Sequence, residues 1–317
     1  MSTPIVVLDG FTSDQGDDAI WQPMRALGDL TVYPRTAPSE VAERVATAAC
    51  VLSNKVPIDA ALIKAAKDLR YVGVLATGYN GVDIPGLEAA GVALTNVPGY
   101  STESVAQWVF AALLHAFGDV AGHASAVRDG AWARSADFCF FTTPIEDLAG
   151  KTLAVVGMGA IGSAVARIAQ GFGMRIVAAQ VPGRPASSQR VPLAEALAEA
   201  DVVSLHCPLT ADTEGMVSAA FLQQLKPGAV LVNSGRGGLL DEEAVCAALD
   251  SGQLRAACLD VLTSEPPPAG HSLASHPRAV VTPHIAWGSV ASRTRLVAEA
   301  AANVAAFLGG EQRNRIV

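Results

Sequence analysis

The sequence is poor in aromatic and charged residues. Phe, Trp and Tyr make up 5% of its 317 residues and Asp, Glu, Lys and Arg make up 16%, whereas half of the residues are apolar. Disordered proteins combine low hydrophobicity with high net charge, so this composition indicates a chain that folds into a packed core. At roughly 150 residues per domain, the length predicts two domains.

Positive charge is scarce as well. The chain has 22 Lys and Arg against 30 Asp and Glu, which gives a formal net charge of −8. Proteins that bind nucleic acid usually carry a basic stripe, and this sequence has no block of like charges. We therefore expect neither a nucleic acid nor a membrane surface as a partner.

Cysteine is sparse and irregularly placed. The five cysteines are odd in number and form no C-x-x-C pair, which argues against a disulfide framework and against a zinc site built from cysteine. Neither His271 and His276 nor any mixed Cys and His group has the spacing typical of metal ligands. We expect no bound metal.

Long apolar runs are absent. The first run, Ile5–Leu8, is too short for a signal peptide, and Leu153–Ala166 is interrupted by three glycines and too short to cross a bilayer. A cytoplasmic enzyme is the expected class.

Short β-branched runs recur along the chain, separated by longer segments with helical spacing. The runs are apolar on both faces, as in parallel strands that helices cover on each side. We predict an α/β fold with two doubly wound parallel sheets and right-handed crossovers. The predicted strands are Ile5–Leu8, Ala49–Leu52, Tyr71–Leu75, Val92–Thr95, Leu153–Val156, Arg175–Ala179, Asp201–Leu205, Ala229–Asn233, Ala256–Leu259 and Ala279–Thr282.

A stretch without a clear strand, Tyr100–Gly150, divides the strands into two groups. It contains an apolar helical segment, Val105–Phe117, and the aromatic run Phe138–Phe141. Packing of this run on its own domain is the simpler expectation, and contact with a second subunit is the alternative.

The last helical segment, Ser289–Leu308, has no strand after it and is expected to return to the first domain. We therefore predict a discontinuous first domain, residues 1–99 and 288–317. A second domain, residues 100–287, is inserted into it.

A glycine motif follows one predicted strand and opens a helix. In Gly157-x-Gly159-x-x-Gly162, the first glycine permits a tight turn, the second lets the backbone approach a pyrophosphate, and the third packs helix against strand. The helix N-terminus offers N–H groups and partial positive charge to the anion. This context predicts a Rossmann dinucleotide-binding domain, with cofactor contacts from Gly157, Gly159, Ala160, Ile161 and Gly162.

The residue expected to read the ribose is neutral. About 20 residues beyond the motif an Asp or Glu normally accepts from the 2′-hydroxyl of NAD, but Gln180 stands there. An amide does not repel the 2′-phosphate of NADP, and the nearby Arg184 could pair with it. We expect NADP or NAD to bind, with a slight preference for NADP.

Polar residues follow three successive strands of the second domain, where ligands bind in open parallel sheets. His284 suits proton transfer to the substrate oxygen while hydride moves to the neighbouring carbon. A carboxylate such as Glu265 fixes the tautomer of a histidine, and Arg236 offers a fork that grips a substrate carboxylate. We predict these three as the catalytic residues.

Together these motifs resemble the D-isomer-specific 2-hydroxyacid dehydrogenases over essentially the whole chain. The resemblance rests on the glycine motif, Leu205–Thr210 with Thr213, Asn233–Gly237, Asp260 with Glu265-Pro266, and Pro283–Trp287. Within the family, Leu75–Asp83, Val97–Thr102 and Phe138–Phe140 look most similar to the glycerate dehydrogenase, or hydroxypyruvate reductase, group.

The resemblance implies reduction of a small 2-oxo acid, such as hydroxypyruvate or glyoxylate, by a homodimer built on the second domain. It implies a flavodoxin-like first domain that binds substrate, with His284 as the acid/base, Glu265 as its partner and Arg236 as the carboxylate clamp. Further substrate contacts are implied for Asn54, Ala76, Thr77 and Gly78, and further cofactor contacts for Cys207, Pro208, Thr213, Ser234, Gly235, Asp260 and Ala286.

Two alternatives stay open. A formate or phosphite dehydrogenase shares the architecture, although formate dehydrogenases pair the catalytic histidine with an amide, and Glu265 is a carboxylate. A nucleotide-sensing protein similar to the corepressors of this architecture would bind the cofactor and turn over no 2-oxo acid.

Overall fold

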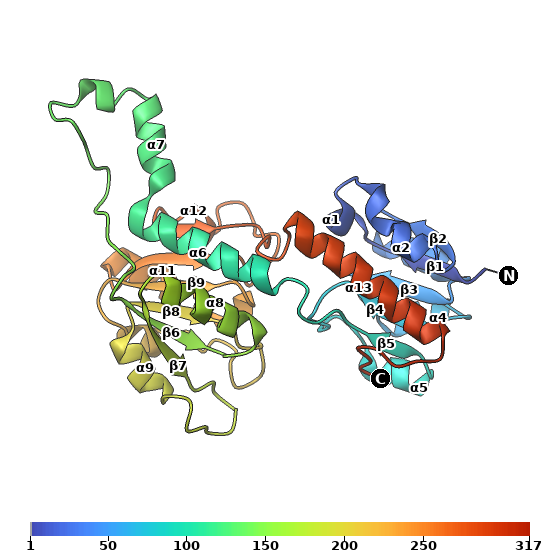
Figure 1. Ribbon diagram of the computed structural model, residues 1–317. Helices are drawn as coiled ribbons and strands as arrows, with labels where there is room; N and C mark the ends of the chain where they lie inside the picture. Colours follow the sequence, from blue (N-terminus) through green and yellow to red (C-terminus); the bar gives the residue numbers. More distant parts are fainter. Residues whose placement is uncertain (1) are drawn as a thin grey trace. The chain divides into compact units, whose positions relative to one another are not determined.

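The computed structural model describes residues 2–317, which form two compact units (Figure 1). Unit 1 contains the chain up to Ser101 together with Gly288–Val317, and unit 2 contains Thr102–Trp287. Each unit is built on its own parallel sheet with helices interleaved along the chain, which confirms the predicted α/β class.

The sheet of unit 1 has five parallel strands in the order β2-β1-β3-β4-β5. This is the flavodoxin-like order, in which the direction of winding reverses between β1 and β3. The strands are β1 (Pro4–Val7), β2 (Asp29–Val32), β3 (Cys50–Ser53), β4 (Tyr71–Val74) and β5 (Ala93–Thr95).

The sequence missed β2. This edge strand reads Asp29-Leu30-Thr31-Val32 and buries only Leu30, so it lacks the continuous apolar run that marks the other strands. A strand with one neighbour and one covered face has little need for such a run.

Helices cover both faces of the unit 1 sheet. The helices are α1 (Phe11–Asp14), α2 (Gln22–Arg25), α3 (Val41–Val45), α4 (Ala60–Ala65), α5 (Ile84–Ala89) and α13 (Val290–Leu308), with 3-10 turns at Asp18–Trp21 and Pro38–Glu40. Val45, Leu62 and Leu87 of α3, α4 and α5 pack in one cluster with strand residues such as Val51. The long helix α13 packs against β4, α1 and α2.

The sheet of unit 2 has six parallel strands in the order β11-β10-β9-β8-β6-β7. A Rossmann sheet usually has one more strand beyond β7. Here a single parallel bridge between Ala179 and Val191 occupies that place. The strands are β6 (Thr152–Val156), β7 (Arg175–Ala179), β8 (Val202–Leu205), β9 (Ala229–Asn233), β10 (Leu254–Leu259) and β11 (Ala279–Val281).

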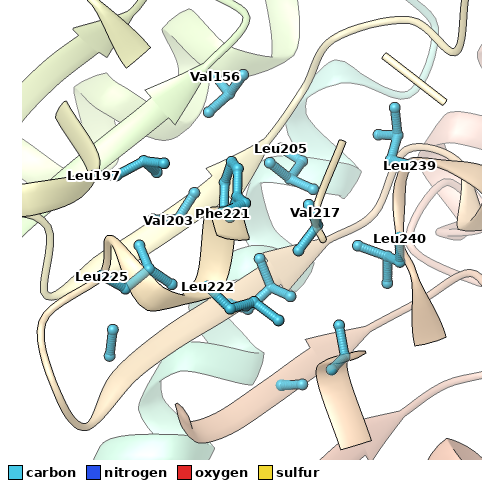
Figure 2. Packing of buried hydrophobic residues seen from close by; sticks show 14 of the residues in the cluster. Val156, Leu197, Val203, Leu205, Val217, Phe221, Leu222, Leu225, Leu239 and Leu240 are labelled. Atoms are coloured by element: carbon cyan, nitrogen blue, oxygen red, sulfur yellow. The ribbon is translucent and has the colours of Figure 1, made fainter. Parts of the chain in front are cut away.

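Alternate residues of these strands pack into two hydrophobic clusters, one on each face. The helices of unit 2 are α6 (Thr102–Gly118), α7 (Val120–Arg128), α8 (Ala160–Gly171), α9 (Leu193–Glu199), α10 (Ala219–Gln223), α11 (Glu242–Ser251) and α12 (Ser272–Ser275), with 3-10 turns at Trp132–Arg134 and Gly237–Leu239. Leu153 and Val155 pack with α6 and α8, whereas Ala154 and Val156 pack with α9, α10 and α11. Figure 2 shows Leu197, Val203, Leu205 and Phe221 gathered in the second cluster.

Residues 120–145, here called the arm, project from the rest of unit 2 (Figure 1). α7 buries none of its side chains. Trp132 is 54% exposed, Phe138 88% and Phe141 69%, so the expectation that the aromatic run packs on its own domain is wrong for the two phenylalanines. Phe140 is half-buried, and its ring centroid lies 6.4 Å from that of His123.

Within residues 2–317, no single helix combines the length and hydropathy needed to span a membrane. Only α6 and α7 taken together, bent by 57° at their junction, have a sufficiently long apolar stretch.

Candidate active site

The glycine loop joins β6 to α8, and the three glycines differ in what surrounds them. Gly157 has φ +106°, and a β-carbon there would lie 2.6 Å from the main chain of His206. A β-carbon on Gly162 would collide with the carbonyl oxygen of Gly157. Gly159 is the N-cap of α8 and faces open space. The first and third glycines therefore shape the loop, while the second leaves room for a ligand.

Two features of the loop region fit a dinucleotide. The N–H groups of Ala160, Ile161 and Gly162 at the start of α8 have no hydrogen-bond partner within residues 2–317. The Ser234 hydroxyl is buried, and it too has no hydrogen-bond partner within residues 2–317. Unpaired N–H groups at a helix N-terminus suit a pyrophosphate, and a buried unpaired hydroxyl suits a polar group such as a carboxamide.

The loop after β8 carries three predicted cofactor contacts. Cys207 is buried, which raises the pKa of its thiol to about 11 and keeps it protonated. The Thr213 hydroxyl donates to the carbonyl oxygen of Pro208 at 2.8 Å and accepts from the N–H of Thr210 at 2.8 Å. These bonds close the loop into a fixed turn beside the glycine loop.

The loop after β9 positions Arg236. The buried Asn233 donates from its side-chain amide to the carbonyl oxygen of Arg236 at 2.8 Å, and its amide oxygen accepts from the N–H of Gly235 at 3.0 Å. One guanidinium nitrogen of Arg236 donates to the carbonyl oxygen of Gly235, while the others have no partner within residues 2–317. Part of the guanidinium fork is therefore free for a ligand.

Glu265 and His284 form the central pair of the candidate site. The Glu265 Oε2 lies 2.6 Å from the His284 Nδ1, although the two residues follow different strands, β10 and β11. The second oxygen of Glu265 accepts from the N–H of Leu262 at 3.1 Å. Nδ1 is thus the protonated nitrogen that donates to the carboxylate when the ring is neutral, and Nε2 is left for a ligand.

Asp260 holds the loop that carries His284. Its carboxylate is buried and accepts from the Thr282 hydroxyl at 2.6 Å and from the N–H groups of Ile285 and Ala286, both at 2.8 Å. Burial raises the pKa of Asp260, and these three donors oppose the rise. The resemblance implied contact with the cofactor, and the hydrogen bonds give Asp260 the additional task of fixing the loop.

The end of β7 is organised by Gln180. Its side-chain amide donates to the carbonyl oxygens of Val181 at 3.3 Å, Arg184 at 2.9 Å and Pro185 at 3.0 Å. The amide oxygen is buried without a partner in the described residues, and Arg184 is exposed. The amide group of Gln180 thus braces the turn that follows the strand.

The predicted substrate contacts of unit 1 lie at the carboxyl ends of β3 and β4. The side chain of Asn54 donates to the Thr12 hydroxyl at 3.2 Å. The N–H groups of Ala76, Thr77 and Gly78 have no partner within residues 2–317, so this turn offers three free donors. Such a row of N–H groups suits a carboxylate.

Sequence reasoning missed Asp9, which shapes the same end of unit 1. Its carboxylate accepts from the N–H groups of Asn54 at 2.8 Å, Lys55 at 2.6 Å and Val56 at 3.2 Å. A single Asp after the first strand has no motif around it, and its partners lie more than 40 residues away along the chain.

Glu242 was missed as well. It accepts from the N–H of Thr263 at 2.8 Å and lies 3.0 Å from the Nε2 of His271, which ties both ends of the Glu265 loop to the start of α11. Within residues 2–317, no group of three or more His, Cys, Asp and Glu side chains could hold a metal ion.

Known proteins are similar to this chain over most of its length. The model of the D-isomer specific 2-hydroxyacid dehydrogenase NAD binding domain matches residues 110–286. A hydroxypyruvate reductase of Blautia hydrogenotrophica is 38% identical over 317 residues and 98% of each chain is covered. A glycerate dehydrogenase of Methylorubrum extorquens is 37% identical over 279 residues, with 87% of this chain and 88% of that one covered.

A solved structure extends the comparison to the cofactor. An acyclic imino acid reductase in complex with NADPH and D-Arg superposes with a TM-score of 0.86 and 26% identity, covering 99% of this chain and 100% of the other. The matched domain and this neighbour together indicate a nicotinamide dinucleotide as the cofactor.

Proposed function

Because the chain belongs to the D-isomer specific 2-hydroxyacid dehydrogenase family, we propose that it reduces hydroxypyruvate, and more slowly glyoxylate, to the corresponding 2-hydroxy acid. Membership makes it an NAD(P)-dependent oxidoreductase that transfers hydride within a 2-oxo acid and 2-hydroxy acid pair. The observation that carries the proposal is the 2.6 Å contact between Glu265 and His284. The names of the two relatives support the choice of substrate.

His284 is the proton donor in this proposal. The nicotinamide cofactor, when bound, supplies the hydride that reduces the carbonyl carbon. The Glu265 carboxylate holds Nδ1 and stabilises the imidazolium, so that Nε2 gives its proton to the carbonyl oxygen as the hydroxyl forms. In the reverse direction the neutral ring takes that proton back.

Arg236 is the proposed clamp of the substrate carboxylate in unit 2. The free part of its guanidinium pairs with the carboxylate and polarises the adjacent carbonyl group. In unit 1, taken by itself, the free N–H groups of Ala76, Thr77 and Gly78 are donors that also suit a carboxylate, and Asn54 follows the neighbouring strand β3. A compact 2-oxo acid carries the carboxylate and the carbonyl group that such donors recognise.

Residues of the glycine loop and of the loops after β8 and β9 hold the cofactor. The free N–H groups of Ala160 and Ile161 bind the pyrophosphate, and the buried Ser234 hydroxyl bonds to the nicotinamide carboxamide. Gln180 has no charge to repel a 2′-phosphate, and the exposed Arg184 can pair with one. We therefore propose that both NADPH and NADH serve as cofactors; the sequence slightly favoured NADPH.

Initial rates of cofactor oxidation test the proposed function. Hydroxypyruvate, glyoxylate, pyruvate and phenylpyruvate are compared with NADPH and NADH, and the configuration of the product is determined by chiral chromatography. The proposal expects the highest kcat/KM with hydroxypyruvate and a D-product. A preference for phenylpyruvate, or no turnover of any 2-oxo acid, would contradict it.

A variant of the acid/base residue completes this test. His284→Ala should lower kcat by a factor of about 100 or more, because a positioned general acid contributes 10²–10⁴-fold. Cofactor affinity, measured by fluorescence titration, should change little. A variant that keeps near-normal turnover would overturn the role of His284.

We also propose that the exposed aromatic side chains of the arm are covered by a second copy of unit 2. Trp132, Phe138 and Phe141 are all exposed within the arm, and exposed apolar side chains that gather on one segment often mark a protein–protein contact. Light scattering should give a dimer for the native chain and a monomer, or a weakened dimer, for Phe138→Ser with Phe141→Ser. A monomeric native chain would refute the proposal.

A further inference from the structure

The acidic group that the ribose site lacks at residue 180 is present nearby, on a different loop. Asp212 follows β8, and Gly183 follows β7. Gly183 has φ +71°, and a β-carbon placed on it would collide with the Asp212 carboxylate. The carboxylate therefore lies directly against the turn that Gln180 braces.

The sheet order places this contact at the adenosine end of the cofactor site. β6 lies between β7 and β8, so the loops after β7 and β8 flank the glycine loop that follows β6. In a Rossmann domain the pyrophosphate lies on that glycine loop and the adenosine ribose lies at the end of the next strand. Asp212 and Gly183 thus meet beside the position of the ribose.

Gln180 is poorly suited to discriminate between the two cofactors. Its amide nitrogen is engaged by the carbonyl oxygens of Val181, Arg184 and Pro185, and its amide oxygen is buried. The Gln180 side chain, which stands where the 2′ position is normally read, therefore points into its own loop. The main effect of Gln180 is to fix the positions of Gly183 and Arg184.

The loops after β7 and β8 carry two exposed side chains of opposite charge that have no partner within residues 2–317. The carboxylate of Asp212 is exposed and has no hydrogen-bond or ion-pair partner within residues 2–317. The guanidinium of Arg184, next to Gly183 in the chain, is also exposed and unpaired in those residues. A 2′-phosphate is attracted by Arg184 and repelled by Asp212, whereas a 2′-hydroxyl can donate a hydrogen bond to the carboxylate.

We propose that Asp212, and not residue 180, is the residue that discriminates against NADPH in favour of NADH, with Arg184 opposing it. The inference rests on the nicotinamide cofactor of the proposed function and is independent of which 2-oxo acid is reduced. Because the two charges act in opposite directions, removing each one alone should move the ratio of the two affinities in opposite directions.

Calorimetric titration with NADP+ and NAD+ tests the inference without any turnover. Asp212→Asn should tighten binding of NADP+ by about fivefold and leave or slightly weaken that of NAD+, as the size of interactions between exposed charges suggests. Arg184→Ala should weaken NADP+ alone. The same change of ratio is expected in kcat/KM for NADPH and NADH.

Glu214→Gln is the matched control, since it removes the same charge from an exposed position of the same loop. It should leave the affinity ratio unchanged. An unchanged ratio in Asp212→Asn, or an equal change in the two variants, would overturn the inference. Failure of hydroxypyruvate reduction alone would affect the proposed substrate and not this result.

Discussion

The indole N–H of Trp287 donates to the main-chain carbonyl oxygen of His284 at 2.9 Å. His284 has a left-handed backbone conformation, φ 54°, which costs a residue with a side chain of the order of 1–3 kcal/mol. Its N–H donates to the carbonyl oxygens of Asp260 at 2.8 Å and of Thr282 at 2.9 Å. The backbone is thus held from both sides, which directs the imidazole toward Glu265.

Trp287→Phe tests this bond, because it keeps an aromatic ring and removes the donor. We expect kcat to fall by about fivefold, the equivalent of one hydrogen bond of about 1 kcal/mol. The substrate KM should change much less, since the loss lies in the orientation of His284 toward Glu265. An unchanged kcat together with a lower melting temperature would mean that Trp287 serves stability alone.

Glu265→Gln tests the partner of the acid/base residue. An amide still accepts from the Leu262 N–H but no longer stabilises a protonated ring, so kcat should fall by about tenfold to a hundredfold. The substrate KM should change much less. Stopped-flow measurement with deuterated cofactor distinguishes a slower chemical step from slower product release, and a fall confined to product release would contradict the assignment.

These residues also show what a sequence can and cannot predict. The strands of a buried parallel sheet are continuous apolar runs, so ten of them were located, and their ends pointed to Arg236, Glu265 and His284. The contact between Glu265 and His284 follows because parallel strands end at one edge of the sheet. Edge strand β2 has no such run and was not predicted.

The direction of a polar side chain is harder to predict than its place on a strand. Gln180 was correctly placed at the end of β7, yet its amide turns into three carbonyl groups of its own loop. Asp9 accepts from three N–H groups of the loop after the neighbouring strand β3, and no local sequence pattern predicts this contact. Such contacts depend on loop geometry, which has no periodic signal.

Arg236→Lys tests whether binding of the substrate carboxylate needs the planar guanidinium or only a positive charge. Lysine keeps the positive charge but loses the planar fork, so the KM for hydroxypyruvate should rise by about tenfold while the affinity for cofactor stays the same. Arg236→Ala should lower kcat as well. Equal effects of the two variants on KM would show that the fork is unimportant.

Gly157→Ala and Gly159→Ala should differ in their effects on stability and on cofactor affinity. A methyl group at Gly157 meets the main chain of His206 and a positive φ, so the melting temperature should fall along with cofactor affinity. At Gly159 the methyl group faces open space, so the fold should stay intact and only cofactor affinity should fall. If Gly159→Ala bound the cofactor normally, the pyrophosphate would not lie against Gly159, and this prediction would be wrong.

His206 should make the folded state sensitive to acid. Burial lowers the pKa of this histidine from 6.5 to about 4, and its Nε2 lies 2.8 Å from the Ser204 hydroxyl. Between these two pH values the unfolded chain binds a proton that the folded chain does not. The stability from the neutral ring is therefore complete above pH 6.5 and falls as the pH drops toward 4.

Urea unfolding of the native chain and of His206→Gln, from pH 7.5 to pH 4.5, measures this effect. The native chain should lose up to about 3 kcal/mol more than the variant across the range, because each pH unit below the unfolded pKa costs at most 1.36 kcal/mol per group. The variant should be the less stable of the two at pH 7.5, where the native ring is neutral and well packed. Parallel pH curves would mean that His206 is accessible to protons in the folded chain, and the acid sensitivity would then belong to other groups.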